Sequence, residues 1–402
     1  MMRGAGAGGG ATPKRVLLVP DGMADEPLDE LHGRTPIAVA RTPNMDALAR
    51  RGTLGLVRTV PEGMPPGSDV ANLSVLGYDP AAVYSGRSPL EAANIGVELG
   101  PDDVAYRCNF VTIVDGVMKD HAGGYISTEE SRCCVAALQA ALGGGPFEFH
   151  TGVSYRNLMV WRGGALVPCT PPHDILDQPV AGFLPGVAAG AGDDPSSEAL
   201  TALWRQADEV LAAVRPATSA WFWGEGTAPS MPAFEDLYGL SGAVVGAVDL
   251  IRGIGRYAGF EVLDVPGATG DLATDYAAKA HAAIAALERH DFVWVHVEAP
   301  DEAGHMGDLH EKITAIERID AEVLGPILAS PQRPAVLVLP DHYTLVHTRT
   351  HAGRPVPFTF ARNDLGEDGL GHRDYSESSA EAAGVVVPDG PALMGLFLAA
   401  TG

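Results

Sequence analysis

The sequence contains few cysteines, few lysines and no long apolar run, and each absence narrows the class of protein. Its four cysteines form no CxxC pair and no other metal-ligand spacing, so neither a disulfide scaffold nor a thiolate metal site is indicated. No apolar run approaches the ~20 residues that a membrane span requires. The N-terminal MMRGAGAGGGATPKR also lacks the apolar stretch of a secretory signal. We therefore expect a cytoplasmic protein with reduced thiols and no membrane partner.

Positive charge is scarce as well. The chain has 27 Lys and Arg residues against 51 Asp and Glu residues, which gives a formal charge of −24. Nucleic acids and anionic membranes bind basic surfaces, so both are poor partners for this chain. With 402 residues, 46% of them apolar, the chain can bury a large core and is long enough for two domains of ~150 residues. The composition is that of a globular protein without a nucleic-acid partner.

Three short apolar runs predict strands that are buried on both faces of a sheet. They are Val16–Val19, Phe292–Val297 and Ala335–Leu339, and helical patterns over 275–290 and 312–328 alternate with them. This alternation predicts an α/β fold with a mostly parallel sheet flanked by helices. Ligands of such folds bind beyond the carboxyl ends of the strands, so the residues that follow these strands should converge on one crevice.

The middle of the chain has a different pattern. Ser127, Thr128 and Glu130 begin a capped helix, two strands follow in FEFHTGVSYRNLMVW, and a long loop rich in proline and glycine comes next. This pattern predicts an inserted α+β domain, after which the main sheet would resume near AWFWGEG or in GAVVGAVDLIRGIG. The predicted organisation is a flexible tail (1–12), a discontinuous core (13–104 and 216–402) and the smaller inserted domain (105–215).

Side chains that bind metals follow each of the three predicted strands. They are Asp21, Asp301 with His305, and Asp341 with His342, and His351 lies on the next loop before the strand-like PVPFTF. Asp301 and His305 share one face if they lie in a helical turn, because residues four apart are neighbours there. Taken singly, each residue could be a turn-forming Asp or a hydrogen-bonded core His. Together, the carboxylates and imidazoles indicate a centre for two divalent cations, which could be Mn²⁺, Mg²⁺ or Zn²⁺.

A serine stands at the start of another helical pattern. Gly67, Ser68 and Asp69 precede the apolar positions of VANLSVL. Ser68 could cap the helix, lie in a phosphate site at the helix N-terminus, or act as a nucleophile that a neighbouring metal activates. The residues alone leave these alternatives open.

Several motifs in combination resemble one family. VLLVPDGMADEP, TPNMDALARRG, PPGSDVANLSVLGYDP, GRSPLEA, RCNF, HVEAPDEAGH, PDH and THAGRPVPF are similar to those of the archaeal-type, cofactor-independent phosphoglycerate mutases of the alkaline phosphatase superfamily. The resemblance spans nearly the whole chain, from Arg15 to about Ala399. It implies an alkaline phosphatase-like α/β core with two divalent metal ions, Mn²⁺ first among them, and a smaller inserted domain that closes over the substrate.

The resemblance also implies roles for single residues. One metal would be held by Asp301, His305 and His351, and the other by Asp21, Ser68, Asp341 and His342. Ser68 would be the catalytic nucleophile and would become phosphoserine. The enzyme would be an isomerase of glycolysis and gluconeogenesis that interconverts 3-phosphoglycerate and 2-phosphoglycerate without a bisphosphoglycerate primer.

A small phosphorylated anion requires local cations in a protein as acidic as this one. The planar guanidinium of arginine suits both phosphate and carboxylate groups. The candidates for binding the substrate are Arg87, Arg107, Arg156 and Lys312. Each could instead be a solvated surface charge.

One segment departs from the family pattern. Where we expect a stretch resembling DRRAGRIS, the chain has DHAGGYIS, so His121, Ala122 and Tyr125 stand in place of three arginines. With GVSYRNLMVW and TPPHDI, this segment looks like a bacterial branch of the family that includes proposed homoserine kinases and has relatives among phosphonate-pathway mutases. The alternatives are therefore another phosphotransferase on the same scaffold, or a non-catalytic metal-binding protein.

Overall fold

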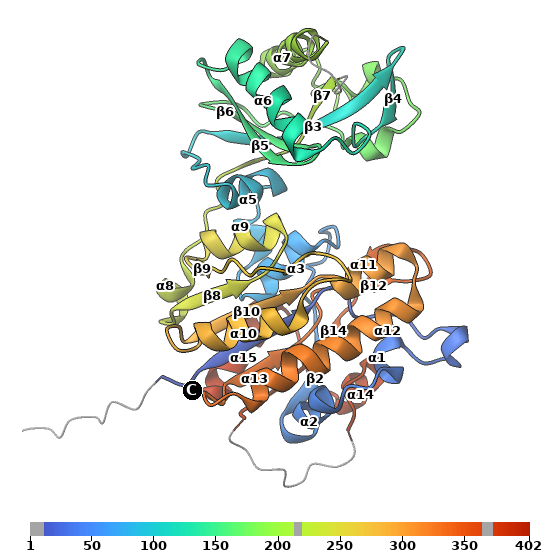
Figure 1. Ribbon diagram of the computed structural model, residues 1–402, viewed down its shortest axis with the longest axis vertical. Helices are drawn as coiled ribbons and strands as arrows, with labels where there is room; N and C mark the ends of the chain where they lie inside the picture. The colour runs from blue at the N-terminus through green and yellow to red at the C-terminus, as the bar shows by residue number, and fades with distance from the viewer. Residues whose placement is uncertain (1–11, 213–218, 364–372) are drawn as a thin grey trace, which may run out of the picture. The chain divides into compact units, whose positions relative to one another are not determined.

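The computed structural model describes residues 12–212, 219–363 and 373–402. The tail predicted over 1–12 lies, except for Thr12, outside the described residues. The chain divides into two compact units (Figure 1). The segment Tyr84–Ser230 forms the smaller unit, and the segments on either side of it form the larger unit. In sequence, the smaller unit is therefore one continuous insertion into the larger.

Eight strands of the described residues form the main sheet of the larger unit. Their order across the sheet is β15 (Val386–Val387), β2 (Thr53–Val57), β14 (Val356–Ala361), β11 (Ala335–Val338), β1 (Arg15–Pro20), β10 (Phe292–Val297), β8 (Gly242–Val245) and β9 (Glu261–Val262). The strands from β11 to β9 in this order run parallel, whereas β14 is antiparallel to both β11 and β2. The prediction of an α/β fold with a mostly parallel sheet is confirmed, and β10 has the predicted bounds.

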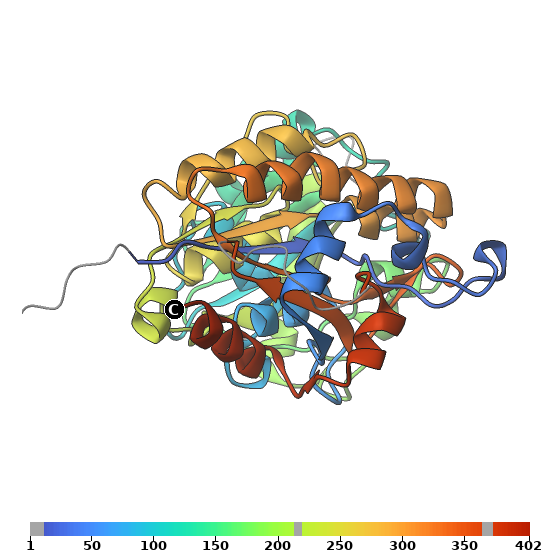
Figure 2. The same ribbon diagram turned by 90° about the horizontal axis from the view of Figure 1, so that it is seen from below.

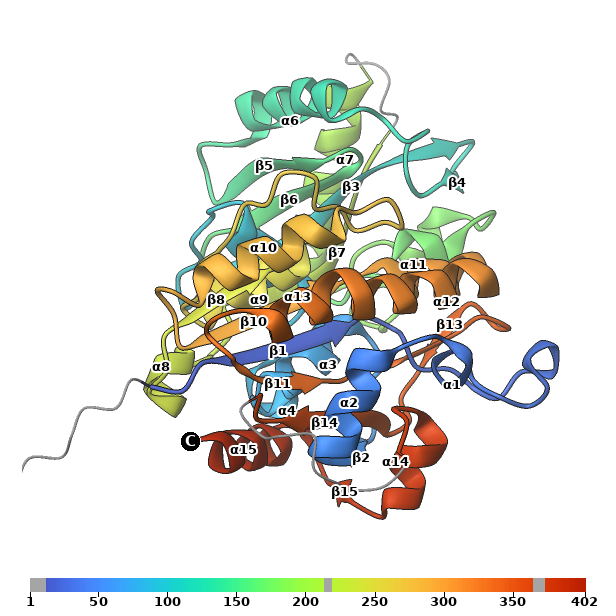
Figure 3. The same cartoon turned by 60° about the horizontal axis from the view of Figure 1, so that its bottom comes forward.

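Helices cover the main sheet on both faces, and this explains why its central strands are continuous apolar runs. One face carries α10 (Tyr276–Ala286), α12 (Leu309–Arg318) and α13 (Gly325–Ala329), and the other carries α3 (Ser68–Val75) and α15 (Gly390–Thr401) (Figures 2 and 3). Every residue of β1 and β10 is buried. A strand that packs against helices on both sides has no solvated face, so its sequence does not alternate.

The helix predicted over 312–328 is interrupted by a π-helical segment, Ile319–Leu324. Inside this segment, the carboxylate of Asp320 accepts hydrogen bonds from the backbone N–H groups of Asn44 (3.2 Å) and Met45 (2.8 Å). These groups are the first N–H groups of α2 (Pro43–Arg51), which have no partner inside their own helix. The π-helical segment therefore carries a side chain that caps a neighbouring helix.

The smaller unit is built on an antiparallel sheet. Its strands are β4 (Val117–Asp120), β3 (Val104–Val114), β6 (Arg156–Trp161) and β5 (Phe147–Val153) in that order, with β7 (Ser219–Thr227) also paired to β3. Its helices are α5 (Arg87–Asn94), α6 (Thr128–Leu142) and α7 (Pro195–Leu211). The predicted capping box of α6 is confirmed, with Ser127 and Glu130 exchanging hydrogen bonds. This unit has the α+β architecture expected of the insertion.

The two faces of β3 contact different helices. Tyr106, Cys108 and Phe110 lie in a core with buried residues of α6 and α7, whereas Ala105 packs in a second cluster with Ala92 of α5. Because side chains alternate along a strand, Arg107 lies on the same face as Ala105. This alternation places Arg107 beside α5.

The boundaries of the smaller unit differ from the predicted range of 105–215. Helix α5 contacts β3, β6 and β7, and β7 pairs with β3 along most of its length. Both flanking segments therefore belong to the insertion. The segment AWFWGEG forms part of β7 in the smaller sheet, so the first of the two predicted points at which the main sheet resumes is wrong. The main sheet resumes at β8, within GAVVGAVDLIRGIG.

Two further observations bear on the sequence analysis. None of the four cysteines, which all lie in the described part of the chain, forms a disulfide. Among the described helices, none is both long enough and apolar enough to cross a bilayer.

Candidate functional site

The carboxyl ends of three adjacent strands bring distant residues to one edge of the main sheet. Asp21 directly follows β1, Asp341 and His342 follow β11, and Asp301 lies just beyond β10. Strands β1, β10 and β11 are parallel neighbours, with Leu18 paired to both Val295 and Val338. The predicted convergence of these residues is therefore confirmed for the larger unit.

Asp301 lies at the centre of a first group of ligand atoms. Asp301 and His305 are on α11 (Ala299–Met306), and the Nε2 atom of His305 lies 3.4 Å from the carboxylate of Asp301. The Nε2 atom of His351 lies 3.3 Å from the same carboxylate and 2.8 Å from Nε2 of His305. His351 is in strand β13 (Thr350–Ala352), which pairs with β12 (Tyr343–Leu345), so its predicted location on a loop is wrong. The three residues could together hold one cation.

His342 lies at the centre of a second group. Its Nε2 atom is 3.6 Å from Oδ1 of Asp21, 3.5 Å from Oδ2 of Asp341 and 3.1 Å from Oγ of Ser68. Ser68 is the first residue of α3, and its hydroxyl faces His342, whereas the N-cap residue of this helix is Gly67. Thus Ser68 is not the capping residue, which was one of the three alternatives. All seven residues predicted as metal ligands lie together in the larger unit.

Close packing around Asp301 fixes the geometry of both groups. The hydroxyl of Thr344 donates to Oδ1 of Asp301 (2.5 Å) and lies 3.2 Å from Nδ1 of His342. Gly22 has a left-handed backbone (φ +58°), and a Cβ atom there would collide with Thr344 and Asp301. Only glycine adopts this conformation readily and leaves room for both side chains. Thr344 and Gly22 therefore position the ligand atoms, and the sequence analysis did not identify either of them.

The imidazole–carboxylate distances fit side chains that share a cation better than side chains that bond to one another. Four imidazole–carboxylate separations run from 3.3 to 3.6 Å. They join Asp301 to His305, Asp301 to His351, Asp21 to His342, and Asp341 to His342. These exceed the ~2.7–3.2 Å of a normal N–H···O hydrogen bond. Two donors that each lie ~2.1 Å from one ion at a tetrahedral angle would be ~3.4 Å apart. The donor set of carboxylates, imidazoles and a hydroxyl therefore fits divalent metal ions.

The electrostatic environment of Asp21 also favours a bound cation. Burial, followed by the nearby carboxylates of Asp341 and Asp301, raises the pKa of Asp21 well above its ordinary value. Its Oδ1 atom is buried without a hydrogen-bond partner. Burial lowers the pKa of His342, which keeps the imidazole neutral and able to act as a ligand. Buried acids crowded in this way either take up a proton or share a positive charge, and a bound cation would supply that charge.

The sequence analysis missed three buried groups beside Asp21. Nε2 of His296, on β10, lies 3.6 Å from Oδ2 of Asp21, and Nδ1 of the same ring lies 3.4 Å from Glu298. Glu298 accepts a hydrogen bond from the fully buried ammonium of Lys279 at 2.7 Å. Burial would raise the pKa of Glu298, but Lys279 and His296 lower it to about 2. A histidine inside the apolar run FVWVHV was the signal that could have revealed this cluster.

The smaller unit holds the three arginines predicted to bind substrate, and they surround one acid. Arg107 forms ion-pair contacts with Glu91 through Nε (2.9 and 3.0 Å) and Nη2, and its guanidinium lies over the ring of Trp223. Burial would raise the pKa of Glu91, but Arg107, then Arg87 and Arg156, hold it below its ordinary value. The guanidinium of Arg107 is therefore held closely by Glu91. Nε of Arg87 lies farther from Glu91, at 3.6 Å, and the side chains of Arg87 and Arg156 are exposed to solvent.

Lys312, the fourth candidate for binding substrate, is completely buried in the larger unit. Its ammonium donates to Asp25 (2.9 Å) and to the backbone carbonyls of Ala24 (3.2 Å) and Thr344 (2.5 Å). These three acceptors match the three protons of the ammonium group. The contacts of Lys312 are those of a structural ion pair, so we do not place it among the substrate-binding residues.

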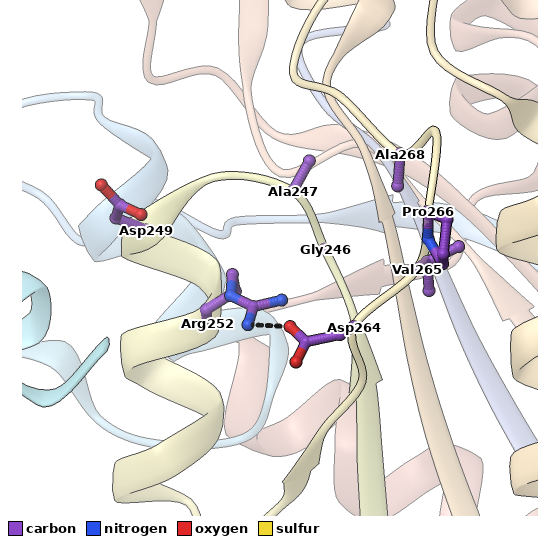
Figure 4. Close-up of a pocket in the computed structure, with 8 residues that line it drawn as sticks. All are labelled: Gly246, Ala247, Asp249, Arg252, Asp264, Val265, Pro266 and Ala268. Atoms are coloured by element: carbon purple, nitrogen blue, oxygen red, sulfur yellow. Dashed lines mark hydrogen bonds and ion pairs between the residues drawn. The ribbon is translucent and has the colours of Figure 1, made fainter. Parts of the chain in front are cut away.

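A separate cavity of about 350 Å³ lies at the ends of β8 and β9 (Figure 4). Gly246, Ala247 and the start of α9 (Asp249–Tyr257) line one side, and the segment from Asp264 to Ala268 lines the other. The guanidinium of Arg252 lies in this cavity and donates to Asp264 at 2.6 Å and to the carbonyl of Leu263 at 3.1 Å. The charge of Arg252 is therefore already engaged by an acid.

A mostly parallel α/β sheet whose strand ends gather carboxylates, imidazoles and a serine hydroxyl is typical of metal-dependent phosphoryl-transfer enzymes. Comparisons with known proteins identify the family. A family model described as "2,3-bisphosphoglycerate-independent phosphoglycerate mutase" matches residues 49–215.

Two relatives with the same name are similar over nearly the whole chain. The protein of Methanothrix thermoacetophila is 47% identical, with 96% of this chain and 100% of the relative aligned. The protein of Methanosarcina acetivorans is 48% identical, with 93% and 97% aligned. The structure of a cofactor-independent phosphoglycerate mutase from Thermoplasma acidophilum has a TM-score of 0.67 and 26% identity, covering 97% of this chain and 100% of that one. The chain belongs to the 2,3-bisphosphoglycerate-independent phosphoglycerate mutase family.

Proposed function

We propose that this protein interconverts 3-phosphoglycerate and 2-phosphoglycerate through a phosphoserine at Ser68. The observation that carries the proposal is the position of the Ser68 hydroxyl, 3.1 Å from Nε2 of His342 and among the buried acids. A hydroxyl that merely stabilised the helix start would bond to backbone N–H groups of its own helix. Membership of the mutase family supports the assignment of substrate and reaction.

The two groups of ligand atoms would each hold one divalent cation. In this proposal Asp301, His305 and His351 bind one ion, and Asp21, Ser68, Asp341 and His342 bind the other. A mixed set of imidazoles and carboxylates suits Mn²⁺, with Mg²⁺ and Zn²⁺ as the alternatives. When bound, such ions lower the pKa of a hydroxyl and offset negative charge on phosphoryl oxygens.

The chain's own residues supply the nucleophile and its position. Ser68 Oγ gives up its proton and forms a bond to phosphorus, while the bond between phosphorus and the glycerate oxygen breaks and that oxygen takes up a proton. The other hydroxyl of the retained glycerate then gives up its proton and attacks the phosphoserine, and Ser68 Oγ leaves and is protonated again. Phosphorus is thus transferred within one substrate molecule, and no bisphosphoglycerate is consumed. The backbone of α3 and the hydrogen bond from Asn72 to Asp341 (2.8 Å) hold the nucleophile and the acids in place.

The smaller unit would bind the anionic groups of the substrate through Arg87 and Arg156. Both side chains are exposed and lie close enough to Glu91 to lower its pKa. Arg107 is a positioning residue in this proposal, because Glu91 and Trp223 already engage its guanidinium. Closure of this unit over the substrate remains a prediction, as does the cytoplasmic location that suits a glycolytic enzyme.

The alternative is a kinase or phosphonate enzyme that uses the same nucleophile. His121 and Tyr125, which replace the expected arginines, contact Tyr155 through their rings at centroid distances of 6.2 and 6.0 Å. A coupled assay with 3-phosphoglycerate, run beside one with ATP and homoserine, separates the two activities. Turnover of 3-phosphoglycerate that is lost in Ser68→Ala and kept in Ser74→Ala, on the same helix, would support the mutase. Turnover only with ATP and homoserine would reject it.

A further inference from the structure

His296 has the surroundings of a metal ligand, although it is outside the set predicted from the sequence. Its side chain is fully buried in the central strand β10, opposite Val19 of β1. Neither ring nitrogen makes a hydrogen bond. Buried imidazoles in proteins almost always have a partner, because an unpaired polar atom in the interior costs about 1–3 kcal/mol. A histidine with a purely structural role would therefore bond to a neighbour.

Glu298 holds the ring of His296 from one side. Oε1 of Glu298 accepts from the backbone N–H groups of Ala247 (3.1 Å) and Val248 (3.4 Å), and Oε2 accepts from Lys279 (2.7 Å). These contacts fix a charged carboxylate 3.4 Å from Nδ1 of His296. The carboxylate favours the tautomer that carries its proton on Nδ1, which leaves the lone pair of Nε2 on the opposite side of the ring.

That lone pair faces Asp21. Nε2 of His296 lies 3.6 Å from Oδ2 of Asp21, as far as Nε2 of His342 lies from Oδ1 of the same carboxylate. Ligand atoms of Asp21, His296 and Asp341 all lie within 4.8 Å of one another. The two groups lie too far apart for a normal hydrogen bond, and a cation between them could accept a lone pair from each.

We propose that Nε2 of His296 is a ligand of the cation held by Asp21 and Asp341, with Glu298 as the carboxylate that orients it. This inference extends the metal centre of the proposed function and rests on it. Around metals in proteins, a carboxylate often accepts the other N–H of a ligating histidine, and loss of such outer partners weakens metal binding ~10–100-fold. Glu298, 3.4 Å from Nδ1, occupies the position of that carboxylate. Lys279 completes the arrangement by balancing the charge of Glu298.

The backbone beside His296 supports this assignment. A Cβ atom on Gly246 would lie 3.8 Å from Cβ of His296 and too close to the side chain of Ile251. Ala247 and Val248, which follow, supply both N–H groups to Glu298, and Gly246 and Ala247 line the cavity in Figure 4. Main chain therefore lies close to Cβ of His296 and binds the carboxylate of Glu298.

The test is Mn²⁺ binding to the full-length, metal-stripped protein, measured by isothermal titration calorimetry and by metal analysis after equilibrium dialysis. His296→Gln should weaken the binding of one Mn²⁺ at least ~10-fold and reduce the rise in melting temperature that Mn²⁺ produces. The melting temperature of the metal-free protein should change little, because His296 makes no hydrogen bond there. His290→Gln is the control, since His290 also pairs with a carboxylate (Glu261, 2.5 Å) in the same unit. Unchanged affinity in His296→Gln would overturn the inference.

A second variant covers the case in which His296→Gln does not fold. Glu298→Gln keeps the shape of the side chain and removes the charge that orients the imidazole. This variant should also weaken the binding of one Mn²⁺, and an unchanged affinity for Mn²⁺ would again reject the inference. Failure of the wild-type protein to bind Mn²⁺, Mg²⁺ and Zn²⁺, each tested singly, would reject the proposed metal centre as a whole. Wild-type binding with an unaffected His296→Gln variant would reject the role of His296 alone.

Discussion

Oγ of Ser68 lies 3.1 Å from Nε2 of His342, although 274 positions separate the two residues in the sequence. Ser68 begins α3 on one face of the main sheet, and His342 follows the central strand β11. The contact places a hydroxyl next to the buried acids Asp21 and Asp341 at the carboxyl ends of the parallel strands. The proposed chemistry depends on this contact between a helix start and a strand end.

Removal of divalent metal should abolish turnover and lower the melting temperature. The carboxylates and imidazoles are grouped as ligands of a cation would be, so an ion that binds them favours the folded state. An ion present at 100 times its dissociation constant adds about 2.7 kcal/mol to the free energy of unfolding. Dialysis against a chelator, followed by addition of Mn²⁺, Mg²⁺ or Zn²⁺ singly, tests this by activity and by thermal unfolding. Full activity in the metal-stripped protein would contradict the proposed centre.

Asp21→Asn should raise the stability of the metal-free protein while it weakens metal binding. The pKa of Asp21 is raised in the folded state by burial and by neighbouring acids. The metal-free wild type therefore loses stability as pH rises from the ordinary pKa of aspartate through the raised one. The asparagine amide of the variant carries no charge, so the variant does not lose stability in this way. Each kcal/mol that it gains in the free energy of unfolding adds ~2–4 °C to the melting temperature.

Melting temperatures of both metal-free proteins between mildly acidic and neutral pH test this prediction. The difference between them should grow with pH. Asp29→Asn, at an exposed position in the same unit, is the control and should leave the pH dependence unchanged. A variant that is less stable than the wild type at neutral pH would contradict the electrostatic account.

Arg87→Met and Arg156→Met should each raise the KM for phosphoglycerate with a smaller effect on kcat. Charge-assisted hydrogen bonds contribute about 1.5–3 kcal/mol, so an increase in KM of ~10-fold or more is expected. Steady-state kinetics measure both constants. Arg205→Met, at an exposed position on α7 of the same unit, is the control. If all three variants had the same KM as the wild type, the proposed substrate role of Arg87 and Arg156 would be wrong.

Lys312→Met should affect stability and not substrate binding. The substitution leaves the carboxylate of Asp25 buried without its cation, and breaking such a pair costs about 3–5 kcal/mol. Urea unfolding measures this loss, and the double variant with Asp25→Asn should recover part of it. Lys119→Met, which breaks the exposed pair with Asp177, should cost no more than about 1 kcal/mol. Unchanged stability together with a raised KM would return Lys312 to the substrate site.

The grouping of Asp21, Asp341, Asp301 and His305 could be predicted from the sequence because each residue stands just beyond a strand or at a helical spacing. Asp21 and Asp341 end apolar runs, and such runs are strands buried on both faces. The spacing of Asp301 and His305 placed them on one face of a helix, and α11 bears this out. These signals are local, since each can be identified within a few residues of the chain.

The rest of the site could not be predicted because it depends on contacts between distant segments. His296 lies inside a strand and resembles a core residue until Asp21 and Glu298 are placed beside it. Lys312 was predicted to bind the substrate because its charge is evident from the sequence, whereas its buried ion pair with Asp25 is not. The C-terminal boundary of the insertion was predicted too early, at residue 215, because β7 belongs to the smaller sheet only through its pairing with β3.

The most direct test of the account is the intact mass of the protein after brief exposure to 3-phosphoglycerate in the presence of Mn²⁺, followed by rapid acid quenching. The wild type should gain the mass of one phosphoryl group, and peptide mapping should locate it on Ser68. The Ser68→Ala variant should gain nothing, and its turnover should fall by more than ~10⁴-fold, the scale seen when a covalent nucleophile is removed. A wild-type protein that turns over 3-phosphoglycerate with no adduct, or a Ser68→Ala variant with full activity, would contradict the central claim.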